Sequence, residues 1–457
     1  MSNELSEVSF WFDSLGALEA ACVSTLPQQV DVAIVGAGFT GLWTAYYLKQ
    51  RDPSLRIAVL EAERVGFGAS GRNGGWCMGS ANGLEQLLAN PHTRSRGLAL
   101  ARALFDTVDE VGRVCRAEHI DAHFAKGGQL SFATVPFHAD AYMRQLAHLH
   151  ALGFGDADYR WLTAAQAGER LRMTPNHGAL FAQHCAVVQP ARLVRGLAEA
   201  VRRQGTLIAE QTPVHALAQA CVHSARGTVR AGAVIRATEG YTDSIAGQRR
   251  RIMPLYSMLT ATEPLPAEIW QQLGLQQREC FGDARRVVMY GQRTFDDRLV
   301  LGGRAGYYFG SRRRAVVPAD DPKVVRVRKL LRTLFPQLAD FRITHGWGGL
   351  MGVPRHWRPC VRWDPATRSG WAGGYVGEGV AASNLAGRTL ADLVLGQTTA
   401  LTELPWVNDE ARRWEPEPLR WLGAQAIEAF GDRADRAESH TGRPSKLWGA
   451  LFDLFVH

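Results

Sequence analysis

The segment Gly36-Ala37-Gly38-Phe39-Thr40-Gly41 has the glycine spacing of a phosphate-binding turn. It lies between a buried strand expected over 30–35 and a helix expected over 39–50. In such a turn the first glycine allows a tight bend, the second lets the backbone approach a pyrophosphate, and the third lets the helix pack on the strand. The amides and the dipole at the helix start favour an anion. The sequence therefore predicts a dinucleotide site.

A carboxylate follows this turn at the distance that ribose recognition requires. A second strand is expected over 56–60, and Glu61 directly after it comes twenty residues after Gly41. Its side chain fits the hydroxyls of an adenosine ribose and would repel a 2′-phosphate, so NADP is disfavoured. Strand, helix and strand together form a βαβ unit, whose crossover is right-handed.

Two further glycine-rich segments favour a flavin over a nicotinamide. The loop over 65–83 holds seven glycines, and 66–76 within it can fold as a nest of backbone amides around a phosphate and a planar ring. The segment 373–379 precedes a helix expected over 380–395. A pyrophosphate needs one helix start, whereas a flavin needs another near the edge where negative charge collects on reduction.

Composition limits the class of protein. The chain has 457 residues, 46% of them hydrophobic and 21% charged, which indicates two packed globular domains. We find no apolar run long enough to span a membrane, and the first fifteen residues carry no Lys or Arg, so a cytoplasmic protein is expected. The seven cysteines are scattered without a C-x-x-C pair, which predicts neither disulfides nor a metal site. The net charge of +8 comes from 47 Arg and 5 Lys spread over the chain, and the runs 249–251 and 312–314 are expected to be solvated.

The remaining pattern predicts an α/β protein. Phe10, Trp11 and Phe12 form an apolar clip, and the tail from 404 onward is rich in Trp and Pro without an evident role. From 251 to 303, strands with alternating aromatic and polar residues indicate a mixed or antiparallel sheet. Further strands are expected over 128–133, 207–210, 228–231 and 233–238, and further helices over 98–118, 139–152, 164–171, 191–204, 322–335 and 447–456.

These segments resemble the FAD-dependent D-amino-acid-oxidase-like superfamily, which includes glycine and sarcosine oxidases. The closest similarity is to its γ-glutamylputrescine-oxidase-like branch. Residues 35–61, 66–75 and 373–387 carry the resemblance, with weaker support from 290–304 and 344–355. It implies a discontinuous Rossmann-like FAD-binding domain (25–85, 155–248 and 345–400), a substrate domain on a mixed, largely antiparallel sheet (86–154 and 249–344), and a C-terminal tail (401–457).

The resemblance also implies residues that bind FAD. No cysteine occurs over 348–352, where some relatives attach flavin covalently, so non-covalent FAD is expected. Val214 would present its backbone to the adenine. The full set is Gly36, Gly38, Phe39, Thr40, Gly41, Glu61, Gly68, Ala69, Ser70, Arg72, Asn73, Gly74, Gly75, Trp76, Val214, Thr238, Gly374, Tyr375, Gly377 and Gly379.

By the same resemblance the reaction is oxidation of a small amine. A hydride moves from the carbon bearing nitrogen to flavin N5, the imine hydrolyses, and O2 reoxidises the flavin to give H2O2. An apolar, aromatic pocket would keep the amine neutral. Arg293 and Arg304 are candidates for an anionic group on the substrate, and His345 and His356 fit structural roles better than proton transfer. The candidate catalytic residues are Tyr256, Met258, Tyr290, Arg293, Trp347, Met351 and Tyr375.

Three alternatives remain open from the sequence. Several relatives use a lysine near the flavin to help oxygen, yet no lysine lies between Lys126 and Lys323, which leaves room for a dehydrogenase with another electron acceptor. A tRNA-base-modifying FAD enzyme would suit the net charge, but no dense basic stripe interleaved with aromatics is evident, so no nucleic acid partner is expected. The third is a flavin-binding sensor without turnover. The oligomeric state is open.

Overall fold

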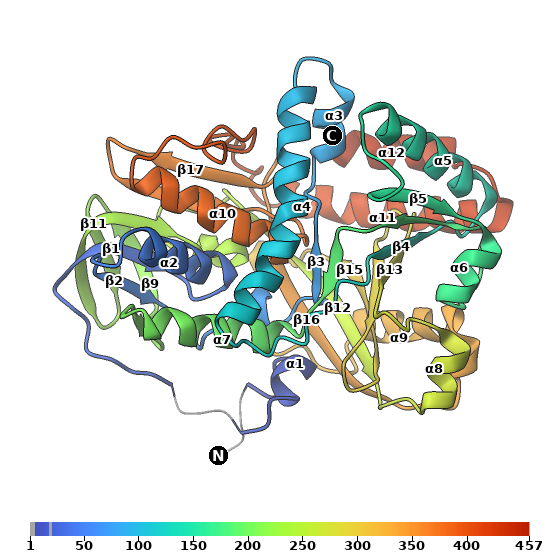
Figure 1. The fold of residues 1–457 in the computed structure, drawn as a ribbon, viewed down its shortest axis with the longest axis horizontal. Coiled ribbons are helices and arrows are strands. Elements are labelled where there is room, and N and C mark those ends of the chain that lie inside the picture. Colours follow the sequence, from blue (N-terminus) through green and yellow to red (C-terminus); the bar gives the residue numbers. More distant parts are fainter. Residues whose placement is uncertain (1–4, 18–20, 457) are drawn as a thin grey trace.

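The computed structural model describes residues 5–17 and 21–456. Its helices alternate with strands along most of the chain (Figure 1). They are α1 (Phe10–Asp13), α2 (Phe39–Arg51), α3 (Leu84–Ala89), α4 (Arg94–Ala117), α5 (Pro136–Ala151), α6 (Ala164–Arg170), α7 (Pro190–Arg203), α8 (Ala267–Leu273), α9 (Pro322–Leu334), α10 (Gly379–Val394), α11 (Leu419–Thr441) and α12 (Lys446–Val456). Among the described residues no helix is both long and apolar enough to cross a membrane.

The first sheet carries the dinucleotide-type βαβ unit. Its strands β1, β2, β8, β11 and β18 are parallel, β17 runs antiparallel at one edge, and β9 and β10 extend β11 as antiparallel hairpins. Side chains on one face pack against α2, α4, α7 and α10, while the other face packs under β9 and β10. In order, the strands are β17 (Cys360–Asp364), β18 (Ser369–Gly373), β11 (Gly227–Arg236), β1 (Gln29–Val35), β2 (Ile57–Leu60) and β8 (Leu207–Ala209), with β10 (Cys221–Ser224) and β9 (Val214–Ala218) off this path.

The second sheet is mixed and largely antiparallel, as predicted. Only β13 and β4 pair in parallel, and α8 and α9 cover one face with a separate apolar core. The strand order is β16 (Ile343–Val353), β12 (Met253–Thr262), β15 (Leu299–Gly306), β14 (Met289–Arg293), β13 (Cys280–Asp283), β4 (Gln129–Phe132), β6 (Ala179–Ala182) and β5 (Tyr159–Leu162). A two-stranded ribbon, β3 (Trp76–Met78) with β7 (Cys185–Val187), lies beside it.

The predicted α/β fold class is confirmed, and most predicted elements occur within a few residues of the expected limits. The strands expected over 228–231 and 233–238 are one continuous strand, β11, which pairs with β1 on both sides of Gly232. The long helix α11 in the tail was not predicted.

The predicted domain limits stay a prediction, and two stretches share packing with the other part. Helix α4, expected in the substrate domain, contributes Leu100, Leu104 and Val108 to the core beneath α2 and α10. Conversely, β5 and β6, expected in the FAD-binding domain, complete the second sheet. Each half of the molecule therefore contains elements that were predicted to belong to the other.

Candidate functional site

The first glycine turn has the geometry that its spacing predicted. Gly36 ends β1 at a φ of +107°, and a Cβ there would lie 2.6 Å from the carbonyl oxygen of Ala237. A Cβ on Gly41 would overlap the carbonyl oxygen of Gly36, so α2 packs at backbone distance on the end of the strand. The first amides of α2 consequently point toward the carboxyl end of the parallel sheet, where such folds bind dinucleotides.

Glu61 lies at the same edge of the sheet. Its Oε2 accepts a hydrogen bond from the amide of Ala37 at 2.7 Å, and its Oε1 accepts one from Glu63 at 3.0 Å. The surrounding protein desolvates the carboxyl group and raises its pKa to about 7. Glu61 is thus tied to the glycine turn, in the position that ribose recognition predicts.

The loop over 66–76 closes on this turn through Ser70 and Asn73. Ser70 Oγ accepts the amide of Phe39, in the first turn of α2, at 2.8 Å. Asn73 Nδ2 donates to the carbonyls of Ala69 (3.1 Å) and Ser70 (3.0 Å), while its Oδ1 accepts the amide of Gly75 at 2.8 Å. These bonds give the loop a fixed shape at the start of the helix.

Arg72 in this loop is a buried cation. Its side chain is 1% exposed, lies over the ring of Phe67, and donates to the carbonyls of Phe67 and Ala315, each at 2.7 Å. None of the described carboxylates lies within ion-pair distance, and Nη2 is buried without a hydrogen-bond partner among the described residues. Burial lowers the pKa of Arg72. This donor is available to an acceptor that the described residues do not supply.

The second glycine turn is joined to the first. Tyr375 Oη lies 3.0 Å from Thr40 Oγ1 on α2, so the approach to α10 lies beside the start of α2. Glu239, in the short 3-10 helix η2 (Glu239–Ser244), accepts the amides of Gly374 (2.7 Å), Gly352 (3.1 Å) and Tyr375 (3.3 Å). This carboxylate therefore ties β16 of the second sheet to the turn before α10.

One face of the second sheet meets these glycine segments. Gln292 Nε2 donates to the carbonyl of Gly74 at 2.5 Å, and the ring of Tyr290 packs on Gly74 so closely that a side chain there would overlap it. Trp347 Nε1 donates to the carbonyl of Arg72 at 2.9 Å. A Cβ on Gly377 would have only Met351 Sδ within 4 Å, at 3.4 Å. The loop and the second glycine turn thus meet β14 and β16, and the first turn is joined to both through Ser70 and Thr40.

Three predicted catalytic residues lie on the opposite face of that sheet. Tyr256 and Met258 share a face that belongs to the core under α9, and the Tyr256 hydroxyl accepts the amide of Arg314 at 2.7 Å. Arg293 lies over the ring of Trp270 and forms an ion pair with Asp297 at 2.6 Å. Alternation along a strand places residues on both faces without showing which one meets a cofactor. The candidate site therefore includes Tyr290, Trp347 and Met351, but not these three residues.

The other predicted residues have varied surroundings. The hydroxyl of Tyr375 is used within the core, so this residue holds the turn rather than facing a substrate. Trp76 Nε1 donates to the carbonyl of Gly291 at 3.1 Å, and Val214 begins β9 with a buried side chain. Thr238 Oγ1 lies 3.0 Å from Thr242 Oγ1. The side chain of Arg304 lies outside the described part of the structure.

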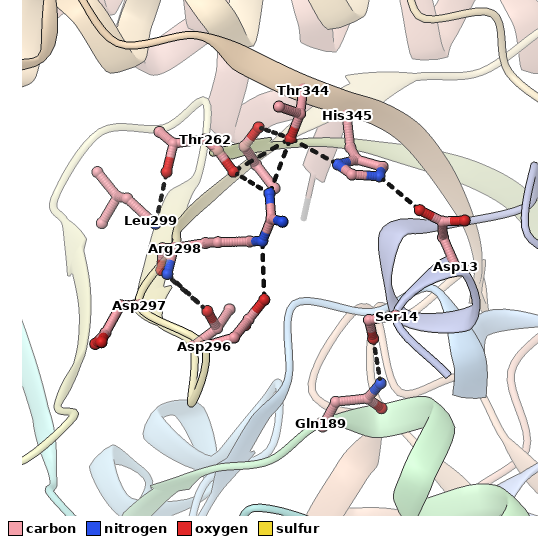
Figure 2. A network of polar contacts seen from close by, with 12 residues as sticks. Asp13, Ser14, Gln189, Thr262, Asp296, Asp297, Arg298, Leu299, Thr344 and His345 are labelled. Carbon is pink, nitrogen blue, oxygen red and sulfur yellow. Dashed lines mark hydrogen bonds and ion pairs between the residues drawn. The ribbon is translucent and has the colours of Figure 1, made fainter. Parts of the chain in front are cut away.

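The histidines belong to structural networks. His345 Nε2 lies 3.0 Å from Asp13 of α1, and its Nδ1 lies 2.8 Å from Thr344 Oγ1, beside Arg298 and Asp296 (Figure 2). His356 Nε2 lies 3.0 Å from the carbonyl oxygen of Asp409. Among the described residues no group of three or more His, Cys, Asp and Glu side chains is arranged to hold a metal ion.

Two contributors were not predicted. The role of Glu239 is visible only in the folded structure. Its carboxylate oxygens accept hydrogen bonds from amides that are more than a hundred residues away in the sequence. The N-terminal segment holds the glycine loop from outside: Ser9 Oγ donates to the carbonyl of Gly71 and Trp11 Nε1 to that of Asn73, both at 2.7 Å. The apolar residues of the clip predicted that this segment packs on the protein, which is confirmed. They did not predict these two hydrogen bonds.

Comparison with known proteins agrees with this geometry. The family model for FAD dependent oxidoreductases (DAO) matches residues 31–393. The chain is 30% identical over 441 residues to gamma-glutamylputrescine oxidoreductase of Escherichia coli (strain K12), covering 92% of this chain and 97% of that protein. It is 30% identical over 390 residues to the probable oxidoreductase OrdL of Rhizobium meliloti (strain 1021), covering 82% and 85%. Glycine oxidase from Geobacillus kaustophilus superposes with a TM-score of 0.70 at 21% identity, covering 85% of this chain and all of that one. The chain therefore belongs to the DAO family of FAD-dependent oxidoreductases.

Proposed function

We propose that this protein is an FAD-dependent amine oxidase that binds FAD non-covalently and oxidises the carbon next to an amine nitrogen. One observation carries the proposal. The two glycine turns and the loop over 66–76, distant along the chain, are joined to one another, and the loop contacts one face of the second sheet. A single long ligand with an adenosine at one end and a planar ring at the other matches such a site.

The residues present fit FAD. The start of α2 and Glu61 would hold the pyrophosphate and the ribose, and Arg72 Nη2 is a buried donor that lacks an acceptor in the described protein. Strand β16 carries no cysteine over 348–352. The nearest cysteine downstream, Cys360, is buried on β17, and burial raises the pKa of its thiol to about 12. A thiol of this kind is a poor nucleophile, which supports non-covalent binding.

When bound, FAD supplies the acceptor for the hydride that leaves the substrate carbon. The chain must bind the amine in its neutral form, because an ammonium group has no lone pair to stabilise the developing iminium. Trp347 is buried, Met351 nearly so, and Tyr290 is half-buried on the same face. An apolar, aromatic surface disfavours the charged amine. Tyr290 Oη is kept in place by Ser257 Oγ at 2.7 Å.

For the electron acceptor we propose O2. The two lysines that limit the lysine-free stretch of the sequence form ion pairs, Lys126 with Asp109 and Lys323 with Glu428. Arg72 is a buried positive charge in the loop beside the face, and it can serve the superoxide-like anion that forms when oxygen takes an electron. The missing lysine favours a second candidate, a dehydrogenase that reduces another acceptor. Stoichiometric hydrogen peroxide would exclude that candidate.

The test is an anaerobic titration of the purified yellow protein with amines, followed at the main flavin absorbance band. γ-Glutamylputrescine comes first, because it is the substrate named for a relative, and is followed by other secondary and primary amines and amino acids. Bleaching by at least one amine, with the colour restored by air and peroxide released, is expected. Protein that is colourless and cannot be reconstituted with FAD would contradict the proposal.

A further inference from the structure

A second pocket lies on the far side of the first sheet from the helices. It is formed by β11, β17 and β18, by the tip of the β9–β10 hairpin and by Gln248, with a volume of about 330 Å³. Val234 of β11 faces this side, together with residues of β9 and β10, whereas its neighbour Ile235 faces α2 and α10. The pocket therefore lies on the face of the sheet opposite α2 and α10, with Arg236 at the carboxyl end of β11.

Arg236 forms the floor of the pocket. It is 5% exposed and lies over the ring of Trp371, with Cζ 4.8 Å from the ring centroid. In the described part of the chain its side chain makes one hydrogen bond, from Nη1 to Thr242 Oγ1 at 2.6 Å, and no carboxylate lies within ion-pair distance. Burial, with Arg251 nearby, lowers the pKa of Arg236 to about 10. A guanidinium has five donors, so most of them remain for another partner.

Two more arginines line the same pocket. Arg251 and Arg362 both pair with Glu410, the latter at 3.0 Å, so the lining holds three guanidinium groups and one carboxylate, which pairs with two of them. Two further carboxylates lie close by but are held elsewhere. Glu239 accepts backbone amides behind the sheet, and Asp364 accepts the amide of Ala366 and the hydroxyl of Thr367. The pocket lining therefore has an excess of positive charge.

We propose that this pocket binds a small oxyanion, a carboxylate or phosphate compound, through Arg236, Arg251 and Arg362. Arginine suits this role because its planar fork matches carboxylate and phosphate oxygens in pairs. An anion bound here would provide the buried Arg236 with a negatively charged partner, which the described residues do not supply within ion-pair distance. Burying a charge without such a partner is strongly unfavourable.

The test uses the purified full-length protein with its flavin. Citrate and inorganic phosphate are titrated separately by calorimetry at constant ionic strength, with chloride as the balancing anion. Saturable binding of one anion per chain is expected for at least one of the two, and the better of them identifies the oxyanion class. Arg236→Met and Arg362→Met should each weaken binding by about tenfold or more, because each removes a charge-assisted pair of hydrogen bonds.

Arg368→Met is the matched control. Arg368 is exposed in the turn between β17 and β18, lies outside the pocket lining, and among the described residues its side chain donates to the carbonyl of Gly232, so its loss should leave anion binding unchanged. Arg362 is more exposed than Arg236, and its variant decides the matter if Arg236→Met does not fold. The proposal is overturned if neither anion binds, or if Arg362→Met binds as tightly as the unaltered protein. Neither result depends on whether amines are oxidised.

Discussion

At the scale of single residues, Glu239 shows how a carboxylate can organise a cofactor site without touching a cation. It is half-buried, and its three hydrogen bonds come from backbone amides of β16 and of the turn before α10. Desolvation outweighs these bonds and raises its pKa to about 7. The protonation state of one side chain is thereby linked to the position of the second glycine turn.

This pKa predicts a pH-dependent stability. Between the unfolded value of 4.5 and the folded value of about 7, the native state holds a proton that the unfolded state has lost. Stability therefore falls as pH rises through this window and levels off above it, by roughly 2–3 kcal/mol for one such group. Glu61 contributes in the same direction. The measurement is the free energy of unfolding in denaturant at a series of pH values.

Glu239→Gln should remove about half of that decline, because the amide does not titrate while Glu61 still does. Glu263→Gln is the control: this carboxylate is half-buried, and Arg342 lowers its pKa instead. An equally steep decline in Glu239→Gln and in the unaltered protein would show that the carboxylate is already ionised throughout the range.

Residues of the site differed in how well the sequence predicted them. The glycines of the first turn could be predicted because backbone conformation and close approach leave no alternative at Gly36 and Gly41. Tyr256, Met258 and Arg293 could be placed on strands but not on a face, since strand alternation is symmetrical about the sheet. Glu239 has no local signal, because its partners are assembled only by the fold.

At the scale of elements, α1 is a short clamp on the glycine loop. Phe12 packs on Gly71 so closely that a side chain there would overlap its ring, and Trp11 meets Trp347 edge to face at 6.0 Å. His345 on β16 holds the end of the helix through Asp13 (Figure 2). The clamp thus binds the loop to the second sheet.

Trp11→Phe is predicted to weaken FAD binding while leaving the fold intact. Phenylalanine keeps the apolar contact but loses the donor to the carbonyl of Asn73. One hydrogen bond contributes about 1 kcal/mol, which corresponds to roughly fivefold in the dissociation constant. Quenching of flavin fluorescence during titration of the apoprotein measures this constant.

Trp448→Phe is the comparison, because Trp448 stacks on Phe430 in the tail rather than on the loop. It should bind FAD as the unaltered chain does. If both variants bound FAD with the same affinity, α1 would be a packing element without influence on the cofactor.

Elements with strong local signals were predicted, and those that depend on partners were not. The strand over 30–35 is a short apolar run, and the helix after it ends at a clear stop signal before Pro53. Both elements are confirmed. Helix α11 has only small and scattered apolar residues on its buried side, including Ala424, Gly431 and Ala434. Such a face becomes recognisable only against the surface that it covers.

At the scale of the whole molecule, the C-terminal tail joins both halves. Val407 bridges to Val361 in β17 of the first sheet, and Trp414 Nε1 donates to the carbonyl of Val353, at the end of β16, at 2.7 Å. Helix α11 then runs along the second sheet, where Figure 1 draws it in red with α12. Carboxylates of α11 bind Arg286 and Val287, just before β14. Strand β14 is one of the strands whose side chains contact the glycine loop.

The docking of α11 rests on Asp435. Its two oxygens accept the consecutive amides of Arg286 (3.0 Å) and Val287 (2.9 Å), and the side chain is buried. Asp435→Asn would turn an amide N–H₂ toward one of these donors. We expect a loss of about 1–3 kcal/mol in the free energy of unfolding, because a buried backbone donor is left without an acceptor. Denaturant titration followed by tryptophan fluorescence measures it.

Asp432→Asn, one turn earlier on the same helix, separates this effect from a general loss of charge. Asp432 forms an ion pair with Arg326, whose side chain is 49% exposed, so its neutralisation should lower stability by less than about 1 kcal/mol. If the two variants lost the same stability, the amides of Arg286 and Val287 would not depend on Asp435. If only Asp435→Asn is strongly destabilised, the tail contributes to the stability of the sheet that carries the proposed amine site.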